Sequence, residues 1–598
     1  MESPAARRPA LGRRGFIATT SALSAGALLS GACAPASADP ASDAAPQEPT
    51  VRELPDLGPN VRIFDPSTPA AEIQAHLDTV FTRQETAQFG PDRDALLFLP
   101  GTYQVDANIG YYTQIAGLGL LPGDVVINGQ VHVEADWFDG NATHNFWRAA
   151  ENLAVEPSAG FDRWAVSQAS PYRRMHLRGD LVLDDGGWSS GGFMADCRID
   201  GRVESGSQQQ WLTRDSHLAG GWNGANYNMV FVGTEGAPGN TFPDPPHVAV
   251  DESPVVREKP FLYVDGDGAF HVFAPALRTD TRGTTWESGA PEGTSVPLEE
   301  FTVIRPGDGA AEMNAALAAG RHLLITPGVY RLDATLEVTA PGTIVLGLGL
   351  ATLVPDGGII AVEVADVDGV RIAGLLIDAG ETDTFALMRV GPDGSSADHS
   401  ADPTSLHDVF FRIGGAHVGR AQRSLVINSH HVIGDHLWLW RGDHGDGIGW
   451  DLNTAAEGLV VGGDHVTVYG LFVEHYQWHQ TVWNGNHGRT YFFQSEMPYD
   501  PPDQAAWMDG DRRGFASYMV TAGVTAHEAW GVGSYCFFSA DPSVVSDRAF
   551  LVPETGGVRF HCLTTVSLGG TGTIAHIING TGDTAGPGND IARLTAFP

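Results

Sequence analysis

A carboxylate beside aromatic and amide side chains is the first candidate for chemistry in this chain. The stretch "FFQSEMPYDPP", Phe492–Pro502, holds Glu496 among Phe, Gln, Ser and Tyr residues. Apolar neighbours raise the pKa of a carboxyl group, as a general acid requires. A solvated loop glutamate is the simpler interpretation, but it leaves a nearby group of residues unexplained: Glu474, His475, Trp478, Trp483 and Tyr499. Rings beside carboxylates suit a sugar-binding cleft, because pyranose faces stack on rings while hydroxyls hydrogen-bond to acids and amides.

Short strands separated by tight polar turns must position these side chains. Runs such as "SLVINSHHVIGDHLWLW" and "GLVVGGDHVTVYGLFVEH" are rich in Val, Ile, Leu and Phe and are broken by Gly, Asn and Asp. Helical patterns are scarce; we expect helices only over Ala70–Leu77 and Ala310–Leu317. This spacing favours the rungs of a right-handed parallel β-helix over a jelly roll or sandwich, which would need hairpin turns at regular intervals. Glu496 then follows a strand-like run and precedes a Pro-rich loop, a usual place for functional groups.

The chain repeats itself at an offset of 240 residues. "VRIFDPSTPAAEIQAHL" from Val61 is answered by "FTVIRPGDGAAEMNAAL" from Phe301, and two further segments follow in the same order. Ordered internal similarity of this kind indicates a duplicated structural unit. We therefore expect an all-β fold of two tandem β-helix halves packed side by side, a first domain at about 59–295 and a second domain, carrying Glu496, at 296–598.

The N-terminal residues have the pattern of an export signal. Arg13, Arg14 and Phe16 precede a weakly apolar stretch rich in Ala, Gly, Ser and Leu, which predicts a twin-arginine signal over residues 1–38. Cleavage is expected after "ASA", or before Cys33 as in a lipoprotein. Residues 39–58 are rich in Ala, Pro, Ser and Asp and are interpreted as a linker. No later stretch is long and apolar enough for a membrane helix, so the exported body is expected to be soluble or held by lipid alone.

Charge and cysteine content exclude several classes. The formal charge is −37, with 72 acidic and 35 basic residues, so a nucleic-acid partner is not expected. The cysteines other than Cys33 are Cys197, Cys536 and Cys562, without the spacing of a zinc site or a disulfide framework. Cys536 and Cys562 could form one bridge, or all three could be buried free thiols. We expect no metal and no cofactor.

Two further patterns have structural interpretations. "RGDHGDGIGWD" gathers Asp443, His444, Asp446 and Asp451, but its spacing is not that of an EF-hand. We favour turns between rungs, or hydrogen bonding to a substrate, over a calcium site. "GLGL", at Gly117 and Gly347, lacks the strand and long helix of a dinucleotide fold, so these glycines are expected at rung corners.

Five short motifs together resemble a known family. They are "WAVSQAS" (164–170), "SGGFMAD" (190–196), "GSQQQW" (206–211), "VEHYQWHQTVW" (473–483) and "FFQSEMPYDPP" (492–502). Their order over both halves is similar to that in glycoside hydrolase family 55, β-1,3-glucanases built from two tandem β-helices. The resemblance implies a β-glucan substrate, most readily a laminarin-like β-1,3-glucan, and an inverting mechanism.

Position by position, the resemblance assigns roles to individual residues. The general acid falls on Glu496, and the side chains that hold the attacking water fall on Gln168 and Ser190. Direct displacement by water requires an acid on one face of the sugar and a water on the other. The two halves would supply these groups from opposite sides of a cleft. The family pattern assigns no certain base; Glu474 is our candidate for a proton-accepting or electrostatic partner, against a structural role. The residues that we expect to bind substrate are His475, Trp478, Trp483, Tyr499, Gln209, Trp440 and Asp446.

Other functions remain as alternatives. A β-helix polysaccharide lyase would need cationic groups for a uronate substrate, which this acidic chain with one lysine, Lys259, supplies poorly. A non-catalytic glycan-binding protein would explain export and aromatic residues, but it would not require Gln168, Ser190 and Glu496 together. Hydrolysis of another glucan linkage also stays open, as does the choice between exo and endo action. We expect the protein to be a monomer.

Overall fold

Short parallel strands stack into three sheets in the first half of the chain. The computed structural model describes residues 54–598. The predicted export signal, Cys33 and residues 39–53 of the predicted linker lie outside the described residues. The sheet that faces the second half, called here the first facing sheet, has nine strands: β1 (Val61–Phe64), β2 (Asp94–Phe98), β5 (Thr113–Gly117), β7 (Arg148–Glu151), β10 (Pro171–Arg173), β13 (Gly192–Ala195), β16 (Gln210–Arg214), β19 (Asn228–Val232) and β20 (His247–Val250).

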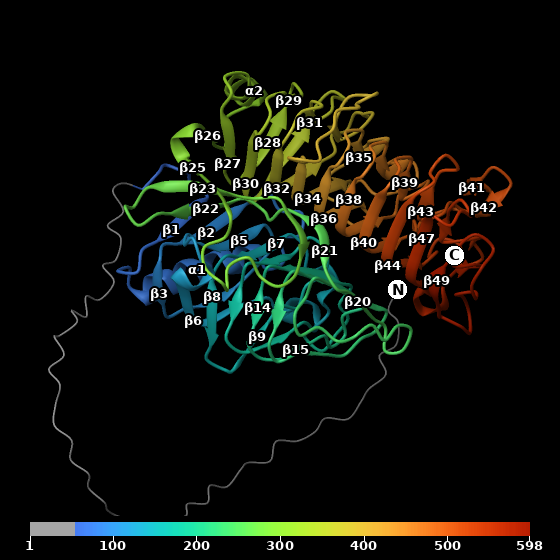
Figure 1. The fold of residues 1–598 in the computed structure, drawn as a ribbon, viewed down its shortest axis with the longest axis horizontal. Helices are drawn as coiled ribbons and strands as arrows, with labels where there is room; N and C mark the ends of the chain where they lie inside the picture. The colour runs from blue at the N-terminus through green and yellow to red at the C-terminus, as the bar shows by residue number, and fades with distance from the viewer. Residues whose placement is uncertain (1–53) are drawn as a thin grey trace, which may run out of the picture. The chain divides into compact units, whose positions relative to one another are not determined.

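The other two sheets complete each turn of the first coil (Figure 1). One contains β3 (Gly101–Tyr103), β4 (Asp106–Asn108), β6 (Val125–His132), β8 (Ala154–Pro157), β11 (His176–Leu177), β14 (Arg198–Ile199) and β17 (His217–Leu218). The other contains β9 (Phe161–Arg163), β12 (Asp180–Val182), β15 (Val203–Glu204) and β18 (Trp222–Asn223). All of these strands pair in parallel, the arrangement of a β-helix.

The second half repeats the plan with longer strands. Its facing sheet, the second facing sheet, contains β26 (Phe301–Ile304), β27 (His322–Ile325), β28 (Val329–Leu332), β30 (Ile344–Pro355), β32 (Arg371–Asp378), β34 (Ser405–Ile413), β36 (Ile433–Arg441), β38 (Thr467–Glu474), β40 (Gly488–Glu496), β44 (His527–Cys536), β47 (Val558–Ser567) and β49 (Ile591–Phe597). Its outer sheet contains β29 (Leu336–Val338), β31 (Val362–Val364), β33 (Met388–Val390), β35 (Arg423–Ile427), β37 (Glu457–Val461), β39 (Thr481–Trp483), β43 (Tyr518–Val520) and β46 (Phe550–Leu551).

Antiparallel strands join the two β-helices. They are β21 (Ser253–Val256) with β24 (Arg278–Thr281), and β22 (Phe261–Val264) with β23 (Phe270–Pro275) and β25 (Gly293–Pro297). Two short strand pairs lie in the C-terminal loops. Strand β41 (Met508–Asp509) pairs antiparallel with β42 (Arg512–Arg513), and β45 (Val545–Ser546) pairs in parallel with β48 (Thr573–Ile574). The assignment of domains to 59–295 and 296–598 remains a prediction.

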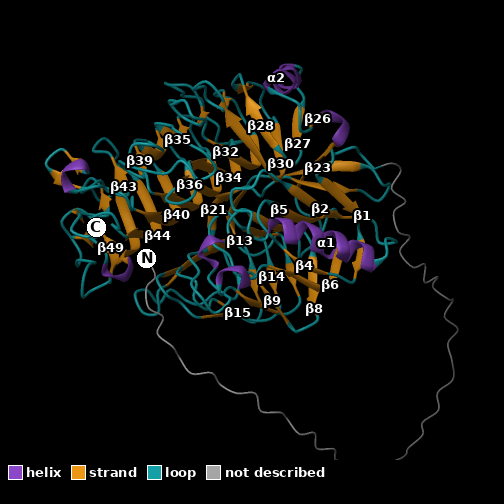
Figure 2. Cartoon of the chain, turned by 180° about the vertical axis from the view of Figure 1, so that it is seen from behind, coloured by secondary structure: helices purple, strands orange, loops and turns teal. Residues whose placement is uncertain are grey.

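The internal repeat reappears as matching elements. Strands β1 and β26 open the two halves, and each is followed by a helix, α1 (Ala70–Gln84) or α2 (Ala310–Ala318). Both helices begin where the sequence predicts. Helix α1 continues past the predicted Leu77 to Gln84, because Val80 and Gln84 extend the buried face that Ile73 and Leu77 begin. Figure 2, seen from behind, shows how few helices accompany the strands.

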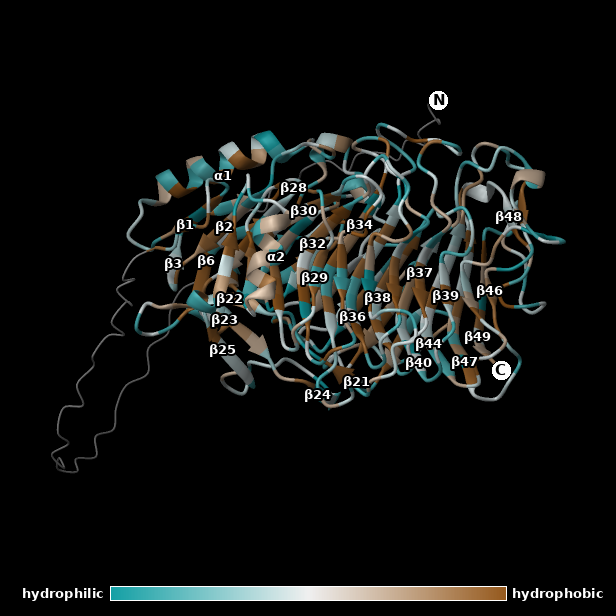
Figure 3. Ribbon diagram, turned by 90° about the horizontal axis from the view of Figure 1, so that it is seen from above, coloured by the Kyte–Doolittle hydropathy of each residue, from teal (hydrophilic) through white to brown (hydrophobic). Residues whose placement is uncertain are grey.

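Each coil has its own apolar interior. Figure 3 shows that hydrophobic residues are concentrated along the strands. Inward side chains from successive rungs form one continuous core in each half. The three described cysteines, Cys197, Cys536 and Cys562, are buried free thiols, so the bridge considered between Cys536 and Cys562 is not formed. None of the helices within residues 54–598 is long and apolar enough to cross a bilayer.

The two facing sheets pack directly on each other. A cluster of buried rings from both halves lies between them, including Trp147, Phe193, Trp438 and Tyr469. The backbones approach closely at Gly470, where φ is 65° and an added Cβ would lie 2.9 Å from the Phe193 ring. Glycine is the residue that allows both this left-handed conformation and this approach.

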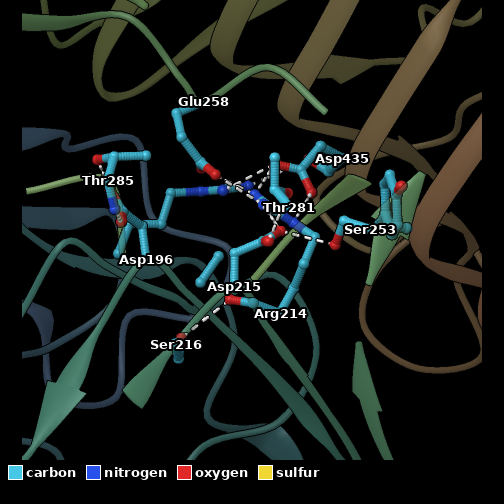
Figure 4. Close-up of polar contacts among 12 residues, drawn as sticks. Asp196, Arg214, Asp215, Ser216, Ser253, Glu258, Thr281, Thr285 and Asp435 are labelled. Carbon is cyan, nitrogen blue, oxygen red and sulfur yellow. Dashed lines mark hydrogen bonds and ion pairs between the residues drawn. The ribbon is translucent and has the colours of Figure 1, made fainter. Parts of the chain in front are cut away.

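A buried group of charged residues also joins the two halves. Arg173 and Arg214, from the first facing sheet, both contact Asp435 of β36, at 2.8 and 2.9 Å. Figure 4 shows Arg214 among the carboxylates of Asp215, Glu258 and Asp435. Charges this deeply buried are tolerated when they are paired and hydrogen-bonded. The pairing therefore fixes how the two β-helices meet, and with it the geometry of the cleft.

Candidate active site

Three neighbouring strands of the second facing sheet end in a row of functional side chains. The register pairs Trp440 of β36 with Glu474 of β38, and Glu474 with Glu496 of β40. Residues in register on parallel strands point to the same face of the sheet. All three side chains therefore project towards the first half from one edge of the sheet.

A pocket of about 220 Å³ opens beside this row. Both halves supply its walls, which are formed by Thr143, His144, Phe146, Gln168, Ser190, Gln209, Trp440, Asp443, His444, Glu474, His475, Glu496, Tyr499 and Leu568. The four residues predicted as catalytic, Gln168, Ser190, Glu474 and Glu496, thus lie in one cavity. Gln168 and Ser190 line it from the first half, and Glu474 and Glu496 line it from the second.

Glu474 is held by donors from both halves. The Gln168 side-chain amide donates to Oε1 at 2.8 Å, and the Trp438 indole N–H donates to Oε2 at 2.8 Å. An indole N–H and an amide N–H can only donate, so both contacts favour the ionised carboxylate. The glutamate side chain is thereby fixed in position between the two β-helices.

Ser190 completes a hydrogen-bonded chain to Glu474. Its hydroxyl lies 3.1 Å from Gln168 Oε1 and 2.8 Å from Ser167 Oγ. The Gln210 side-chain amide donates to the Ser190 carbonyl. Gln168 therefore accepts from Ser190 with its oxygen and donates to Glu474 with its nitrogen. The Ser190 hydroxyl and the Gln168 amide form a polar wall of the pocket that can hold a water molecule.

Glu496 has a different set of partners. The Tyr499 hydroxyl donates to Oε2, and the Gln494 amide lies 3.3 Å from Oε1. Unlike an N–H group, a tyrosine hydroxyl can also accept, so it can serve a protonated carboxyl group. The Glu496 carbonyl accepts from the His475 backbone N–H at 2.8 Å, which ties the loop after β38 to the end of β40.

The electrostatics of the pocket hold a proton on this pair of acids. Burial raises the pKa of Glu474 well above its usual range, and the neighbouring Glu496 raises it further. Burial also raises the pKa of Glu496, against the opposing effects of His475 and the Tyr499 hydrogen bond. Two carboxylates this close disfavour double ionisation. The rise in pKa is larger for Glu474, whereas the donors on both of its oxygens favour its charged form, so the two carboxyl groups compete for one proton.

Asp443 and His444, interpreted from the sequence as residues of turns or as hydrogen-bonding partners of a substrate, both line the pocket. His444 Nδ1 lies 2.8 Å from Asp443 Oδ1, and its ring stacks on His144 at 4.5 Å. Burial opposes ionisation of Asp443, but the neighbouring His475 ring and the His444 hydrogen bond hold its pKa below the usual range. The polar side chains of the "RGDHGDG" run were compatible with a place in the binding site, although its glycines were equally compatible with turns.

Sequence reasoning missed other contacts entirely. Trp438 and Ser167 reach the catalytic candidates only through hydrogen bonds to Glu474 and Ser190. Among the described residues, no group of three or more His, Cys, Asp or Glu side chains is placed to hold a metal ion.

Four of the predicted binding residues, His475, Tyr499, Gln209 and Trp440, line the pocket. The other three do not. Trp483 has no exposed surface; its ring packs in the second core against Tyr518 and His527, so it is a core residue. Asp446 is an exposed loop residue whose backbone pairs with Gly415. Trp478 is 51% exposed and lies outside the pocket lining.

This arrangement can perform acid-assisted hydrolysis. It offers two buried carboxyl groups that disfavour double ionisation, an amide and a hydroxyl able to hold water, and a hydrogen bond that links the amide to Glu474. Trp440, Tyr499 and Phe146 supply rings, and Asp443 and Gln209 supply polar groups for hydroxyls. A polar cavity with aromatic walls suits a neutral, hydroxyl-rich ligand such as a sugar.

Comparison with known proteins agrees with this chemistry. A family model, the LAM55 pectate lyase-like domain, matches residues 301–496. The chain is 54% identical over 547 residues to an exo-β-1,3-glucanase of Streptomyces sp. (strain SirexAA-E / ActE), covering 91% of this chain and 90% of that protein.

Two solved structures are also similar. The structure of sacteLam55A from Streptomyces sp. SirexAA-E superposes with a TM-score of 0.90 at 54% identity, covering 91% of this chain and 99% of that one. A variant of sacteLam55A in complex with glucose has a TM-score of 0.90 at 53% identity, covering 92% of this chain and 100% of that one.

Proposed function

The chain belongs to glycoside hydrolase family 55, and from that premise we propose that it is an exported exo-acting enzyme that hydrolyses β-1,3-glucan with inversion. The glycosidase class follows from the family. The β-1,3 linkage and exo action are supported by the 54% identical exo-β-1,3-glucanase. One observation supports the mechanism: Glu496 lines the same pocket as three hydrogen-bonded side chains, Ser190, Gln168 and Glu474.

In this mechanism Glu496 protonates the glycosidic oxygen. The leaving sugar departs with that proton, and positive charge develops at the anomeric carbon. A water held by the Ser190 hydroxyl and the Gln168 side chain attacks the opposite face. The Glu474 carboxylate, which is hydrogen-bonded to Gln168, takes up the proton that the water releases. No covalent intermediate forms, so the configuration at the anomeric carbon inverts.

The anomer of the first product tests this mechanism. Proton NMR of fresh product, recorded before mutarotation, should show the α-anomer released from β-linked glucan. Release of the β-anomer would contradict inversion and remove the proposed role of the held water. Reaction with β-1,3-, β-1,6-, β-1,2- and mixed-linkage glucans should show the highest kcat/KM with the β-1,3-linked polymer. Glucose appearing as the first product would support exo action, and longer oligosaccharides would contradict it.

Export rests on the sequence. Arg13 and Arg14 precede the apolar stretch, and the proposed cleavage leaves Asp39 or a lipid-modified Cys33 at the N-terminus. N-terminal analysis of the protein produced with its own leader distinguishes the two products, and an unprocessed cytoplasmic product would contradict export. We propose a monomer in solution, which light scattering after size exclusion tests directly.

A further inference from the structure

The loop that follows α1 is longer than its counterpart in the second half. The connection from α1 to β2 spans residues 85–93, whereas the connection from α2 to β27 spans residues 319–321. The added segment contains Gln88 and Phe89. Loop residues that a repeated fold does not require are common carriers of function, so the contacts of this segment indicate its role.

Phe89 carries the loop across to the wall of the pocket. Its ring lies parallel to that of Trp440, with centroids 6.3 Å apart and planes 5° apart, and 5.8 Å from the ring of His444. Both partners line the pocket. At Gly445, φ is 96° and an added Cβ would lie 2.6 Å from the Phe89 ring. The loop of the first half is therefore packed tightly against the pocket residues of the second.

The backbone of Gln88 is held from both halves. The Tyr112 hydroxyl donates to the Gln88 carbonyl at 2.5 Å and accepts from the Arg412 guanidinium of β34 at 2.6 Å. Tyr112 and Arg412 are buried, and Arg412 is paired with Asp378 at 2.6 Å. The Gln88 side chain therefore starts from a fixed point between the two β-helices.

This side chain reaches the ring of His444. Gln88 Nε2 lies 2.6 Å from His444 Nε2, and His444 Nδ1 lies 2.8 Å from Asp443 Oδ1. An ionised carboxylate can only accept, so Nδ1 carries the hydrogen. A neutral imidazole then has its lone pair on Nε2, which the Gln88 amide N–H satisfies. Gln88 thus donates to His444, and His444 donates to Asp443.

The end of this chain lies in the pocket, whereas its beginning does not. Asp443 and His444 line the cavity, and Gln88 lies outside the lining. The Asp443 side chain is 24% exposed, so its carboxylate can still meet a ligand. With Oδ1 held by His444, the carboxylate has a fixed position from which to accept from a sugar hydroxyl.

We propose that Gln88 is a positioning residue of the active site, whose amide holds His444 as the Nδ1–H tautomer so that His444 orients the Asp443 carboxylate towards a substrate hydroxyl. The proposal rests on the proposed function and adds to it a residue that does not touch the substrate. Because Asp443 acts on binding, loss of the Gln88 amide should raise KM about threefold to tenfold and change kcat by less than about twofold.

An isosteric substitution removes the amide alone. Methionine has a similar length and no donor, so Gln88→Met is compared with wild type on long β-1,3-glucan and on the β-1,3-linked trisaccharide. Gln74→Met is the matched control: it makes the same change in the first half, where the Gln74 amide donates to the Asp106 carbonyl at 2.7 Å. We expect equal rises in KM on both substrates for Gln88→Met and wild-type kinetics for the control.

A double-mutant cycle tests whether Gln88 acts through Asp443. If it does, Gln88→Met should raise KM in the wild-type background and add nothing in the Asp443→Ala background. Additive losses would overturn the proposal, as would an unchanged KM in Gln88→Met. A rise in KM accompanied by a lower temperature of thermal unfolding, and independent of Asp443, would assign Gln88 to packing between the halves.

Nitrogen-15 NMR of histidine-labelled protein gives a readout without turnover. It separates protonated from unprotonated ring nitrogens, and the spectrum of His444→Phe assigns the His444 signals. Wild type should show hydrogen on Nδ1 and none on Nε2, whereas Gln88→Glu, whose carboxylate can only accept, should place hydrogen on both. An Nε2–H tautomer in wild type would overturn the proposal. Absence of glucan hydrolysis by wild type would contradict the proposed function, while the expected pair of spectra would still support the role of Gln88.

Discussion

Glu474 and Glu496 are register partners on adjacent parallel strands, so two carboxyl groups lie side by side in one buried pocket. Like charges at this spacing resist simultaneous ionisation. The indole and amide donors stabilise the charge on Glu474, and the proposed mechanism assigns the proton to Glu496. The sheet register thereby places the proposed acid and the proposed base, two chemically identical side chains, next to each other.

The first prediction concerns proton donation. Glu496→Gln should lower kcat on natural glucan by about 10²- to 10⁴-fold, because the amide cannot protonate the leaving oxygen. Glutamine has nearly the same shape, so binding and thermal unfolding should change little. Steady-state kinetics and oligosaccharide binding to the variant measure the two effects separately. Near-normal turnover on unactivated glucan would exclude Glu496 as the acid.

The second prediction concerns pH. The hydrogen bond from Tyr499 lowers the pKa of Glu496 and partly offsets the effect of burial. Tyr499→Phe removes that bond, so the pKa of Glu496 should rise and the acid should keep its proton to higher pH. The basic limb of the kcat/KM profile reports the free enzyme's acid and should therefore move upward. A downward shift, or none, would show that another group controls that limb.

The fold was predictable because its signals are local and repeated. Each short strand, each turn and the helices beginning at Ala70 and Ala310 are encoded within a few residues. The duplication multiplies that signal, which is why two β-helical halves could be expected. The length of α1 was underestimated because its last turn is stabilised by burial of Val80 and Gln84, a tertiary contact that the apolar pattern only partly records.

Residues of the site were predictable from the sequence only where they lie within the family motifs. Gln168 and Glu474 are 306 positions apart, and no local pattern reveals their hydrogen bond. Trp483 lies close to Glu474 in sequence, but the chain leaves the facing sheet after Glu474 and enters the outer sheet, where Trp483 points into the core. Asp443 and His444 enter the pocket through the packing of a loop between the halves, so their sequence was equally compatible with turns.

A third prediction follows from the setting of Ser190. Ser167 Oγ accepts from the Ser190 backbone N–H at 3.2 Å, and it lies 2.8 Å from the Ser190 hydroxyl oxygen and 2.8 Å from the Ala142 carbonyl oxygen. Ser167→Ala should lower kcat about tenfold with little change in KM, because the hydroxyl that orients the water loses its support.

Ser170 provides the matched control for that experiment. It is also fully buried, and its hydroxyl bonds to the Asn145 carbonyl at 3.1 Å. Ser170→Ala should affect stability without a comparable loss of kcat. Equal kinetic losses in the two variants would indicate a general packing effect and would remove the positioning role of Ser167.

The last prediction concerns the charges between the halves. Burial disfavours the Asp435 carboxylate, but Arg173 and Arg214 hold its pKa below the usual range. Asp435→Asn leaves both buried guanidinium groups short of a counter-charge, and breaking such a pair costs about 3–5 kcal/mol. Denaturant unfolding at pH 7 should show a loss of this size. Asp356→Asn is the control: Asp356 pairs with Arg331, and their side chains are 40% and 63% exposed, so about 1 kcal/mol or less is expected.

The pH dependence of the same variant shows whether the Asp435 carboxylate stabilises or destabilises the folded protein. A carboxylate with a lowered folded pKa contributes stability above its unfolded pKa, near 3.9, and that contribution is lost as pH falls through the folded value. The difference in unfolding free energy between wild type and Asp435→Asn should therefore be constant from about pH 7 to 5 and shrink below about pH 4. A difference that grew on acidification would mean that Asp435 is protonated in the folded protein, and charge pairing between the two β-helices would then rest on other carboxylates, such as Asp408, which pairs with Arg173.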